Sequence, residues 1–270
     1  DIASRHGVYI ILVFTDCCCS GDYASIKKYF QVHAPFCNIT NKQSIRAFKK
    51  LIKQIIERKN SINGRIYRDD PTILAWEITN ELEYWRFSES EVNKWINEIA
   101  TYIKILDKNH LVTIGIDGNR SEFSNDNSLY KIFDVPALDF FSFHFYPSSE
   151  NLGSSNLILG EADANKIESI TKKFLSLGKP VIMGEFGFTN SIDLNSKIRS
   201  NRNTVDLYNL AFKRYMDTAF SAGVSGVMFW GWGIPEEKKI PMWWSKENHT
   251  IADEKFCAFL KEYQIPKGHD

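Results

Sequence analysis

The sequence predicts an α/β protein in which parallel strands alternate with helices, in the arrangement of a (β/α)8 TIM barrel. Short apolar runs of strand length recur along the chain and alternate with longer segments of helical periodicity. Two of these runs, Ile73–Thr79 and Val181–Gly184, are followed within two residues by a glutamate. No internal repeat, low-complexity tract or linker interrupts the alternation. We therefore expect a single domain over residues 1–270.

Composition excludes several classes of partner. The chain of 270 residues is long enough for one large α/β domain, and its 33 basic and 33 acidic residues balance. A net charge of zero gives no basic stripe for nucleic acid, and no apolar run is long enough to span a membrane. Aromatic residues make up 14%, which suits a sugar-binding cleft and a large core equally.

The first residues are an unusual beginning for a barrel. Asp1–Gly7 resembles the end of a helix closed by glycine, and Val8–Thr15 is the first apolar strand. A barrel begins with a strand, so we expect the first two βα units to be lacking in this chain. The run Val8–Phe14 would then be an unprotected edge strand, with a gap between it and the last strand and poor solubility. The same residues lack the basic and apolar regions of a secretory signal.

The expected helices and strands follow from apolar spacing and from terminal residues. Ser88 and Glu91 form a plausible capping box at the start of one helix, and Gly178 ends another. We expect the other helices to begin or end near similar signals: Lys42–Lys59, Asn165–Leu177, Thr204–Ala222 and Ile251–Tyr263. The six expected strands are Val8–Thr15, Ile73–Thr79, Leu111–Ile116, Asp139–Phe145, Val181–Gly184 and Gly226–Trp230.

Five cysteines, an odd number, predict no disulfide framework. A long loop over Asp16–Asn41 holds Cys17, Cys18, Cys19, His33 and Cys37, which are candidate ligands for a soft metal. Three adjacent cysteines cannot easily aim all their sulfurs at one tetrahedral ion, so free or partly paired thiols are favoured over a metal. Glycosylation sequons occur at Asn38, Asn119 and Asn248, a number close to chance.

The two strand-end glutamates predict hydrolytic chemistry. The turn Asp69–Pro71 leads into an apolar run that ends on Asn80 and Glu81, and Lys179–Gly187 repeats the pattern around Glu185. Polar residues at the carboxyl ends of buried parallel strands are typical of α/β enzymes. A pair of carboxylates is what glycoside hydrolysis requires. The alternative is a surface glutamate that happens to follow a strand.

These segments resemble glycoside hydrolase family 5, and within it the endo-β-1,4-mannanases. The resemblance covers nearly the whole chain in the family's order. It rests on four segments: the acid/base segment Arg65–Glu81, the His-x-Tyr strand Phe143–Pro147, the nucleophile strand Lys179–Gly187 and the last strand Val227–Trp230.

The resemblance implies a role for each candidate residue. Glu81 would be the acid/base and Glu185 the nucleophile of a retaining enzyme, with Asn80 bound to the sugar 2-hydroxyl. His144 and Tyr146 would line the site, Tyr146 orienting Glu185, and Trp230 would form the floor under the sugar. Asn80 could instead hold the strand end, and His144 could be a core histidine. Three further tryptophans could extend the cleft or simply pack: Trp232, Trp243 and Trp244.

The sequence also departs from the family pattern. Leu82 and Glu83 stand where the mannanases usually have Pro and Arg, and no Asn-Asn-Trp follows Thr15. The family's active-site Arg on the second strand has no counterpart. The resemblance implies a retaining endo-β-1,4-glycosidase of mannan or glucomannan, and the alternatives are a β-1,4-glucanase or a non-catalytic carbohydrate-binding relative. We expect a monomer whose partner is a polysaccharide or oligosaccharide, without metal or cofactor; the family implies secretion.

Overall fold

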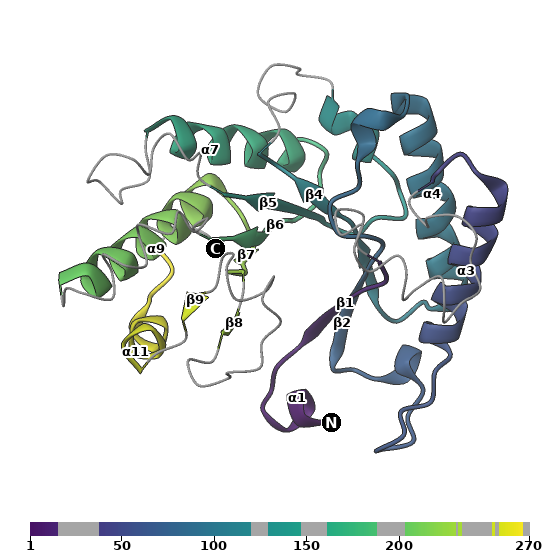
Figure 1. Ribbon diagram of the computed structural model, residues 1–270, viewed down its shortest axis with the longest axis horizontal. Coiled ribbons are helices and arrows are strands. Elements are labelled where there is room, and N and C mark those ends of the chain that lie inside the picture. The colour runs from purple at the N-terminus through teal and green to yellow at the C-terminus, as the bar shows by residue number, and fades with distance from the viewer. Residues whose placement is uncertain are drawn as a thin grey trace. The chain divides into compact units, whose positions relative to one another are not determined.

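The computed structural model describes residues 1–15, 38–119, 129–146, 161–187, 203–230, 232–233, 250–251 and 254–266. The chain divides into two compact units, whose elements are labelled in Figure 1. Unit 1 comprises Asp1–Asp117 and Asn127–Ser142, and unit 2 comprises Gly118–Asp126 and Phe143–Asp270. Each unit is described by itself.

Unit 1 is built on parallel strands. Strands β1 (Ile10–Val13), β2 (Ile73–Glu77) and β3 (Leu111–Thr113) pair in that order, with Leu12 opposite Trp76 and Trp76 opposite Val112. The expected strand Leu111–Ile116 is interrupted at Ile114 and continues as β4 (Gly115–Asp117). The next strand, β5 (Phe141–Phe145), approaches β3 at its start, where the Asp139 N–H donates to the Val112 carbonyl over 2.9 Å. The predicted parallel pairing is thus confirmed within this unit.

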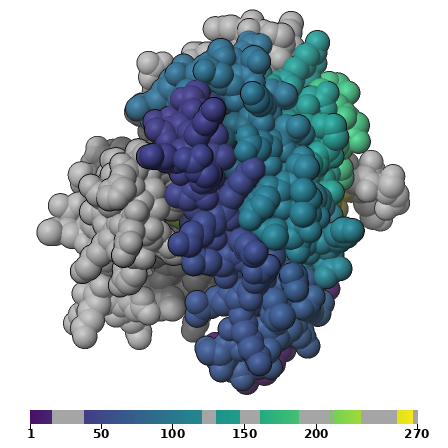
Figure 2. Space-filling view, turned by 90° about the vertical axis from the view of Figure 1, so that its right-hand side faces the viewer, coloured from purple at the N-terminus to yellow at the C-terminus, as the bar shows by residue number. Residues whose placement is uncertain are grey.

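Two long helices cover this sheet. Helix α3 (Lys42–Ile56) is capped by the Asn41 side chain, and α4 (Glu89–Leu106) begins with the predicted capping box of Ser88 and Glu91. Phe48 of α3 stacks on Trp95 of α4 with ring centroids 6.0 Å apart, and both rings are buried. The two helices lie side by side in Figure 1, and Figure 2 looks onto their outer face.

The predicted helix end near Gly7 is confirmed, the end of the predicted helix Lys42–Lys59 is shifted, and the 3-10 helices of unit 1 were not predicted. Helix α1 (Ile2–Arg5) ends before Gly7, whose φ of +67° is the left-handed conformation that glycine tolerates. Helix α3 ends three residues before the predicted Lys59, because Lys59 forms an antiparallel bridge with Ile66 instead. The described residues of unit 1 also form three 3-10 helices: η1 (Tyr67–Asp69), η2 (Tyr84–Arg86) and η3 (Leu129–Phe133).

A buried polar cluster joins the end of α4 to the beginnings of β2 and β3. The Asp107 carboxylate accepts the Trp76 indole N–H at 2.7 Å and lies 2.6 Å from His110 Nδ1. His110 Nε2 in turn faces the Asp70 carbonyl oxygen at 3.0 Å. Burial favours a higher pKa for Asp107, but hydrogen bonds from His110, Trp76 and the Asn109 N–H, with the charge of His110, hold that pKa below its usual value.

Unit 2 continues the pattern of parallel strands under helices. The end of β5 is followed in order by β6 (Val181–Phe186) and β7 (Gly226–Val227), with Met183 opposite Val227. Helices α7 (Glu161–Leu175), α9 (Asn203–Ala222) and α11 (Glu254–Glu262) belong to this unit. Its core is aromatic: Phe186 lies 5.2 Å from Phe212 and 6.1 Å from Tyr215, measured between ring centroids.

Some boundaries in unit 2 differ from the predictions. Helix α7 begins at Glu161 rather than Asn165, because Glu161 and Asp163 suit the positive end of the helix dipole. Regular pairing in β7 covers two residues, but single backbone bonds extend it: the Trp230 N–H still donates to the Phe186 carbonyl at 2.8 Å. The prediction of helix from Ile251 was wrong, since β9 (Thr250–Ile251) pairs in parallel with β8 (Trp232–Gly233). Two-residue strands carry no periodicity that a sequence can reveal.

Several sequence expectations concern residues outside the described ranges. They are Cys17, Cys18, Cys19, His33, Cys37, Trp243, Trp244 and Asn248. Cys257 of α11 is a free thiol. Among the described residues, no helix combines the length and the apolar character needed to cross a bilayer.

Candidate active site

Glu185 lies near the carboxyl end of β6 and is held by side chains from β5. The Tyr146 hydroxyl donates to Glu185 Oε2 at 2.7 Å, and His144 Nδ1 lies 3.6 Å from the same oxygen. The side chain of His144 is 2% exposed and that of Glu185 15% exposed, so the pair is largely withdrawn from water. A hydrogen bond to the ionised form of a carboxyl favours that form. The arrangement therefore favours a Glu185 carboxylate with a fixed orientation.

Strand alternation explains why these three side chains meet. Phe145 and Phe186 pack against Tyr215 of α9, with ring centroids 6.2 and 6.1 Å from it. Because successive side chains of a strand point to opposite faces, the residues beside each phenylalanine point away from the helix. His144, Tyr146 and Glu185 consequently share the other face.

Two glycines allow the backbones around Glu185 to approach closely. A Cβ atom on Gly118 would lie 2.6 Å from the His144 carbonyl oxygen, and one on Gly187 would lie 2.9 Å from the Trp230 carbonyl oxygen. Neither distance is compatible with a side chain. Gly187 follows Glu185 by two residues, so Trp230 lies beside the end of β6. Its side chain is 41% exposed, which leaves ring surface open to a ligand.

Asn119 is a site residue that the sequence analysis treated only as a sequon. Its side-chain oxygen accepts the Tyr146 backbone N–H at 2.6 Å, and its side-chain N–H donates to the Tyr146 carbonyl oxygen. The Lys166 ammonium of α7 donates to the Asn119 carbonyl oxygen at 2.5 Å. No short-range sequence pattern marks such a contact, because 27 positions separate its two partners.

Asn80 and Glu81 belong to unit 1, where they extend β2 beyond its last paired residue. The Asn80 N–H donates to the Thr15 carbonyl at 2.9 Å, and the Thr79 carbonyl accepts the Gly115 N–H at 3.0 Å. The backbone is thus held on both sides up to Asn80. Glu81 then adopts a φ of +44°, a left-handed conformation that is uncommon for residues other than glycine. Such strain is found most often at functional positions.

The residues after Glu81 anchor the turn. Leu82 and Tyr84 are 1% and 3% exposed, and the Tyr84 ring packs edge-on against Phe133 with centroids 5.8 Å apart. Glu83 pairs with Arg86 over 2.9 Å at the surface. The two departures from the family pattern therefore have local roles, Leu82 as an apolar anchor and Glu83 as one half of an exposed ion pair.

The structure brings together three predicted site residues in unit 2, His144, Tyr146 and Glu185, with Trp230 beside them. Asn80 and Glu81 are positioned by unit 1.

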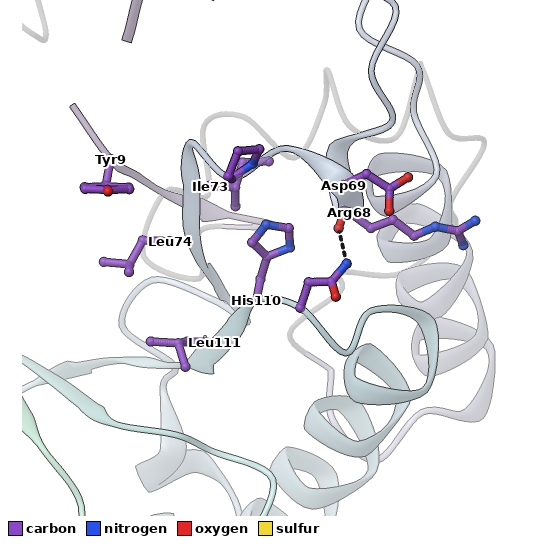
Figure 3. A pocket seen from close by; sticks show the side chains of 9 residues that line it. Tyr9, Arg68, Asp69, Ile73, Leu74, His110 and Leu111 are labelled. Carbon is purple, nitrogen blue, oxygen red and sulfur yellow. Dashed lines mark hydrogen bonds between the residues drawn. The ribbon is translucent and has the colours of Figure 1, made fainter. Parts of the chain in front are cut away.

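A separate hollow of about 400 Å³ lies in unit 1 at the beginning of β2, whereas Glu81 follows the other end of that strand. Figure 3 shows Tyr9, Leu74 and Leu111 around it, with the Asn109 side chain bonded to the Arg68 carbonyl at 2.9 Å. In parallel α/β barrels the amino ends of the strands serve stability and the carboxyl ends serve catalysis. This hollow therefore does not belong to the candidate active site.

The family model described as "GH family 5 beta-mannosidase-like" matches residues 13–255. The chain belongs to glycoside hydrolase family 5. Among curated proteins, mannan endo-1,4-beta-mannosidase 1 of Arabidopsis thaliana is 28% identical over 233 residues, which cover 77% of this chain and 55% of that protein. Probable mannan endo-1,4-beta-mannosidase A-2 of Aspergillus terreus is 27% identical over 245 residues, or 86% of this chain and 54% of that one. The chain thus spans about half the length of these relatives.

Solved structures of family 5 support the predicted fold. The endo-beta-1,4-mannanase from Thermotoga petrophila aligns with a TM-score of 0.69 at 23% identity, covering 96% of this chain and 58% of that one. A hyperthermostable endo-1,4-beta-D-mannanase from the same species aligns with a TM-score of 0.65 at 25% identity, covering 96% and 75%. These neighbours are (β/α)8 barrels, and this chain has the fold of part of such a barrel.

Proposed function

We propose that the protein is a retaining endo-β-1,4-mannanase in which Glu185 is the nucleophile and Glu81 the acid/base. The observation that carries the proposal is the Tyr146–Glu185 hydrogen bond at the carboxyl end of a parallel strand, in a chain of family 5. A nucleophilic carboxylate must be ionised and must point at one carbon atom. A hydrogen bond from a phenol stabilises the ionised carboxylate and also fixes its orientation.

In the first step a Glu185 oxygen forms a bond to the anomeric carbon while the bond from that carbon to the glycosidic oxygen breaks. Glu81 gives its proton to the departing oxygen, so the leaving sugar is released as an alcohol. In the second step Glu81 takes a proton from water, the water oxygen bonds to the anomeric carbon, and Glu185 is released. Two inversions give overall retention.

The remaining residues would bind the sugar. Asn80, fixed by its backbone bond to Thr15, would hydrogen-bond the 2-hydroxyl, a contact that tightens as the ring flattens toward the transition state. The exposed ring of Trp230 offers an apolar surface for the C–H face of a pyranose. The buried imidazole of His144 would remain close to the Glu185 carboxylate and largely shielded from water.

Replacement of each glutamate tests the assignment. Glu185→Ala should abolish turnover of all substrates, and azide should restore cleavage with inverted configuration, since azide then replaces the nucleophile. Glu81→Ala should still react with activated aryl glycosides, which need little protonation, and azide should give a product of retained configuration. Glu168→Ala removes an exposed carboxylate of α7 and serves as the matched control. Full activity of either active-site variant on polysaccharide would contradict the mechanism.

Substrate choice needs a separate experiment. The relatives are named as mannan endo-1,4-beta-mannosidases, so mannan and glucomannan should be hydrolysed faster than cellulose and xylan. Reducing-sugar release from these four polysaccharides measures the preference. Faster hydrolysis of cellulose would instead identify a β-1,4-glucanase, and binding of all four without hydrolysis would identify a carbohydrate-binding protein.

A further inference from the structure

The end of β5 is held by an unusual form of strand pairing. The last backbone bond on this side of the strand runs from the Gly118 N–H to the His144 carbonyl, at 3.0 Å. Tyr146 lies two residues beyond His144, immediately after β5. The side-chain amide of Asn119 bonds both the backbone N–H and the carbonyl oxygen of Tyr146. One amide group thus imitates the peptide of a neighbouring strand.

The geometry points to Asn119 as a positioning residue for catalysis, which holds Tyr146 in place so that its hydroxyl orients Glu185. This inference rests on the proposed function, because it assigns Glu185 the role of nucleophile. The Asn119 side chain bonds backbone atoms of Tyr146, and it acts on the Glu185 carboxylate through the Tyr146 hydroxyl.

The two bonds from the Asn119 side chain to the Tyr146 backbone are called the Asn119 clamp. Three features of the fold hold this clamp in place. Gly118 has no room for a side chain beside the His144 carbonyl, so the chain before Asn119 lies close to β5. Asn119 itself is partly buried, and the Lys166 ammonium bonds its carbonyl oxygen from α7. A charge-assisted bond of this kind restrains the backbone on which the amide is carried. Strand β5, the segment Gly118–Asn119 and helix α7 therefore together fix the position of the Tyr146 phenol.

Small displacements of Tyr146 matter because the bond to Glu185 is directional. Hydrogen bonds weaken steeply when the angle at the hydrogen closes, and a misplacement of about 1 Å can cost about 100-fold in rate. Loss of the two Asn119 bonds would loosen the backbone of Tyr146, and the hydroxyl would shift with it. The expected result is a nucleophile that is less well oriented and harder to ionise.

A double-mutant cycle tests this inference in the full chain, with kcat/KM for an activated aryl β-mannoside as the measure. Tyr146→Phe should lower kcat/KM roughly 10- to 150-fold, the value of a hydrogen bond to a charged group. Asn119→Ala should lower it roughly 10-fold. Asn119→Ala added to Tyr146→Phe should change it by less than about 2-fold, because the residue acts through the missing hydroxyl. Independent, additive losses would overturn the inference.

A second measurement does not need activity. The ionisation of Glu185 can be followed by carbon-13 NMR of the carboxyl groups, with Glu185→Gln to assign the signal. Both Tyr146→Phe and Asn119→Ala should raise the pKa of Glu185, since each weakens the bond to its ionised form. Asn93→Ala is the matched control: it removes an asparagine bonded to the Ile132 carbonyl at 2.9 Å in unit 1, and should leave that pKa unchanged. An unchanged pKa in Asn119→Ala would overturn the inference.

The two measurements separate the inference from the proposed function. If the wild-type chain hydrolyses no β-mannoside, the proposed function fails, but the NMR titration still decides whether Asn119 positions Tyr146. If Asn119→Ala does not fold, Asn119→Gln carries the test. The longer side chain keeps the amide oxygen and the amide nitrogen but displaces both. The pKa of Glu185 should therefore rise less than in Tyr146→Phe. A pKa equal to that of the wild type in Asn119→Gln would then overturn the inference.

Discussion

Each unit has a hydrogen-bonded cluster of polar side chains at one end of its strands, and that end differs between the two units. In unit 1 the cluster of Asp107, His110 and Trp76 lies at the beginnings of β2 and β3. In unit 2 the cluster of Tyr146, His144 and Glu185 lies at the ends of β5 and β6. Both are hydrogen-bonded and largely buried, so burial alone does not identify a site. In parallel α/β barrels the amino ends of the strands serve stability and the carboxyl ends serve catalysis, so the position along the strand favours a structural role for the first cluster and supports the catalytic role proposed for the second.

Asp107→Asn should have the largest effect on stability, with little effect on catalytic geometry. The Asp107 side chain is fully buried and accepts bonds from His110, Trp76 and the Asn109 N–H. Breaking a buried charged pair costs about 3–5 kcal/mol. Urea unfolding should show a loss of that order, whereas Glu98→Gln, which breaks a partly exposed pair with Lys49, should cost at most about 1 kcal/mol. A loss below about 1 kcal/mol in Asp107→Asn would show that the cluster contributes little.

The same carboxylate gives stability a predictable dependence on pH. The pKa of Asp107 is lower in the folded protein than its usual value of 3.8, so the folded state binds the proton less well than the unfolded state. Its contribution is therefore complete above about pH 4 and is lost as pH falls through the lower folded value. Urea unfolding at a series of acidic pH values should show a steeper loss for the wild type than for Asp107→Asn. Parallel curves would contradict the assignment.

In contrast to Asp107→Asn, Gly118→Ala should have a moderate effect on stability and a clear effect on activity. The new Cβ would lie 2.6 Å from the His144 carbonyl, so β5 must shift, at a cost of about 1–3 kcal/mol. His144 and Tyr146 would move with it, and kcat should fall at least about 10-fold. Gly226→Ala is the control, because its Cβ would meet only Ile182 Cγ2 at an ordinary 3.7 Å. Equal activity of Gly118→Ala and Gly226→Ala would contradict the proposal that the Tyr146, His144 and Glu185 cluster serves catalysis.

The strands and helices could be predicted because local patterns encode them. The capping box at Ser88, the glycine at Gly178 and the run Ile73–Thr79 are all visible over a few residues. The meeting of Tyr146 with Glu185 was expected from the family resemblance. These signals cover most of the fold.

Other features of the candidate site are long-range contacts and backbone strain, which local sequence patterns do not encode. Asn119 and Tyr146 lie 27 positions apart, and nothing in either local sequence indicates that one amide would bond the other's backbone. The left-handed conformation of Glu81 was equally unpredictable, since glycine and asparagine are the usual residues there. Long-range contacts and strain depend on the assembled fold, and a sequence pattern does not record them.

The smallest predicted effect tests the contrast between the two glutamates. Glu185 is held by side chains on a regular strand, whereas Glu81 follows its strand at a φ of +44°. A left-handed residue other than glycine costs about 1–2 kcal/mol, and glycine avoids that cost while losing about 0.4–1 kcal/mol through its freer unfolded chain. Glu81→Gly should therefore be more stable than Glu81→Ala by up to about 1 kcal/mol in urea unfolding. At Glu83, where φ is −74°, the order should reverse, with Glu83→Ala the more stable variant. The same order at both positions would mean that Glu81 carries no backbone strain, and its turn would then be held by Leu82 and Tyr84 alone.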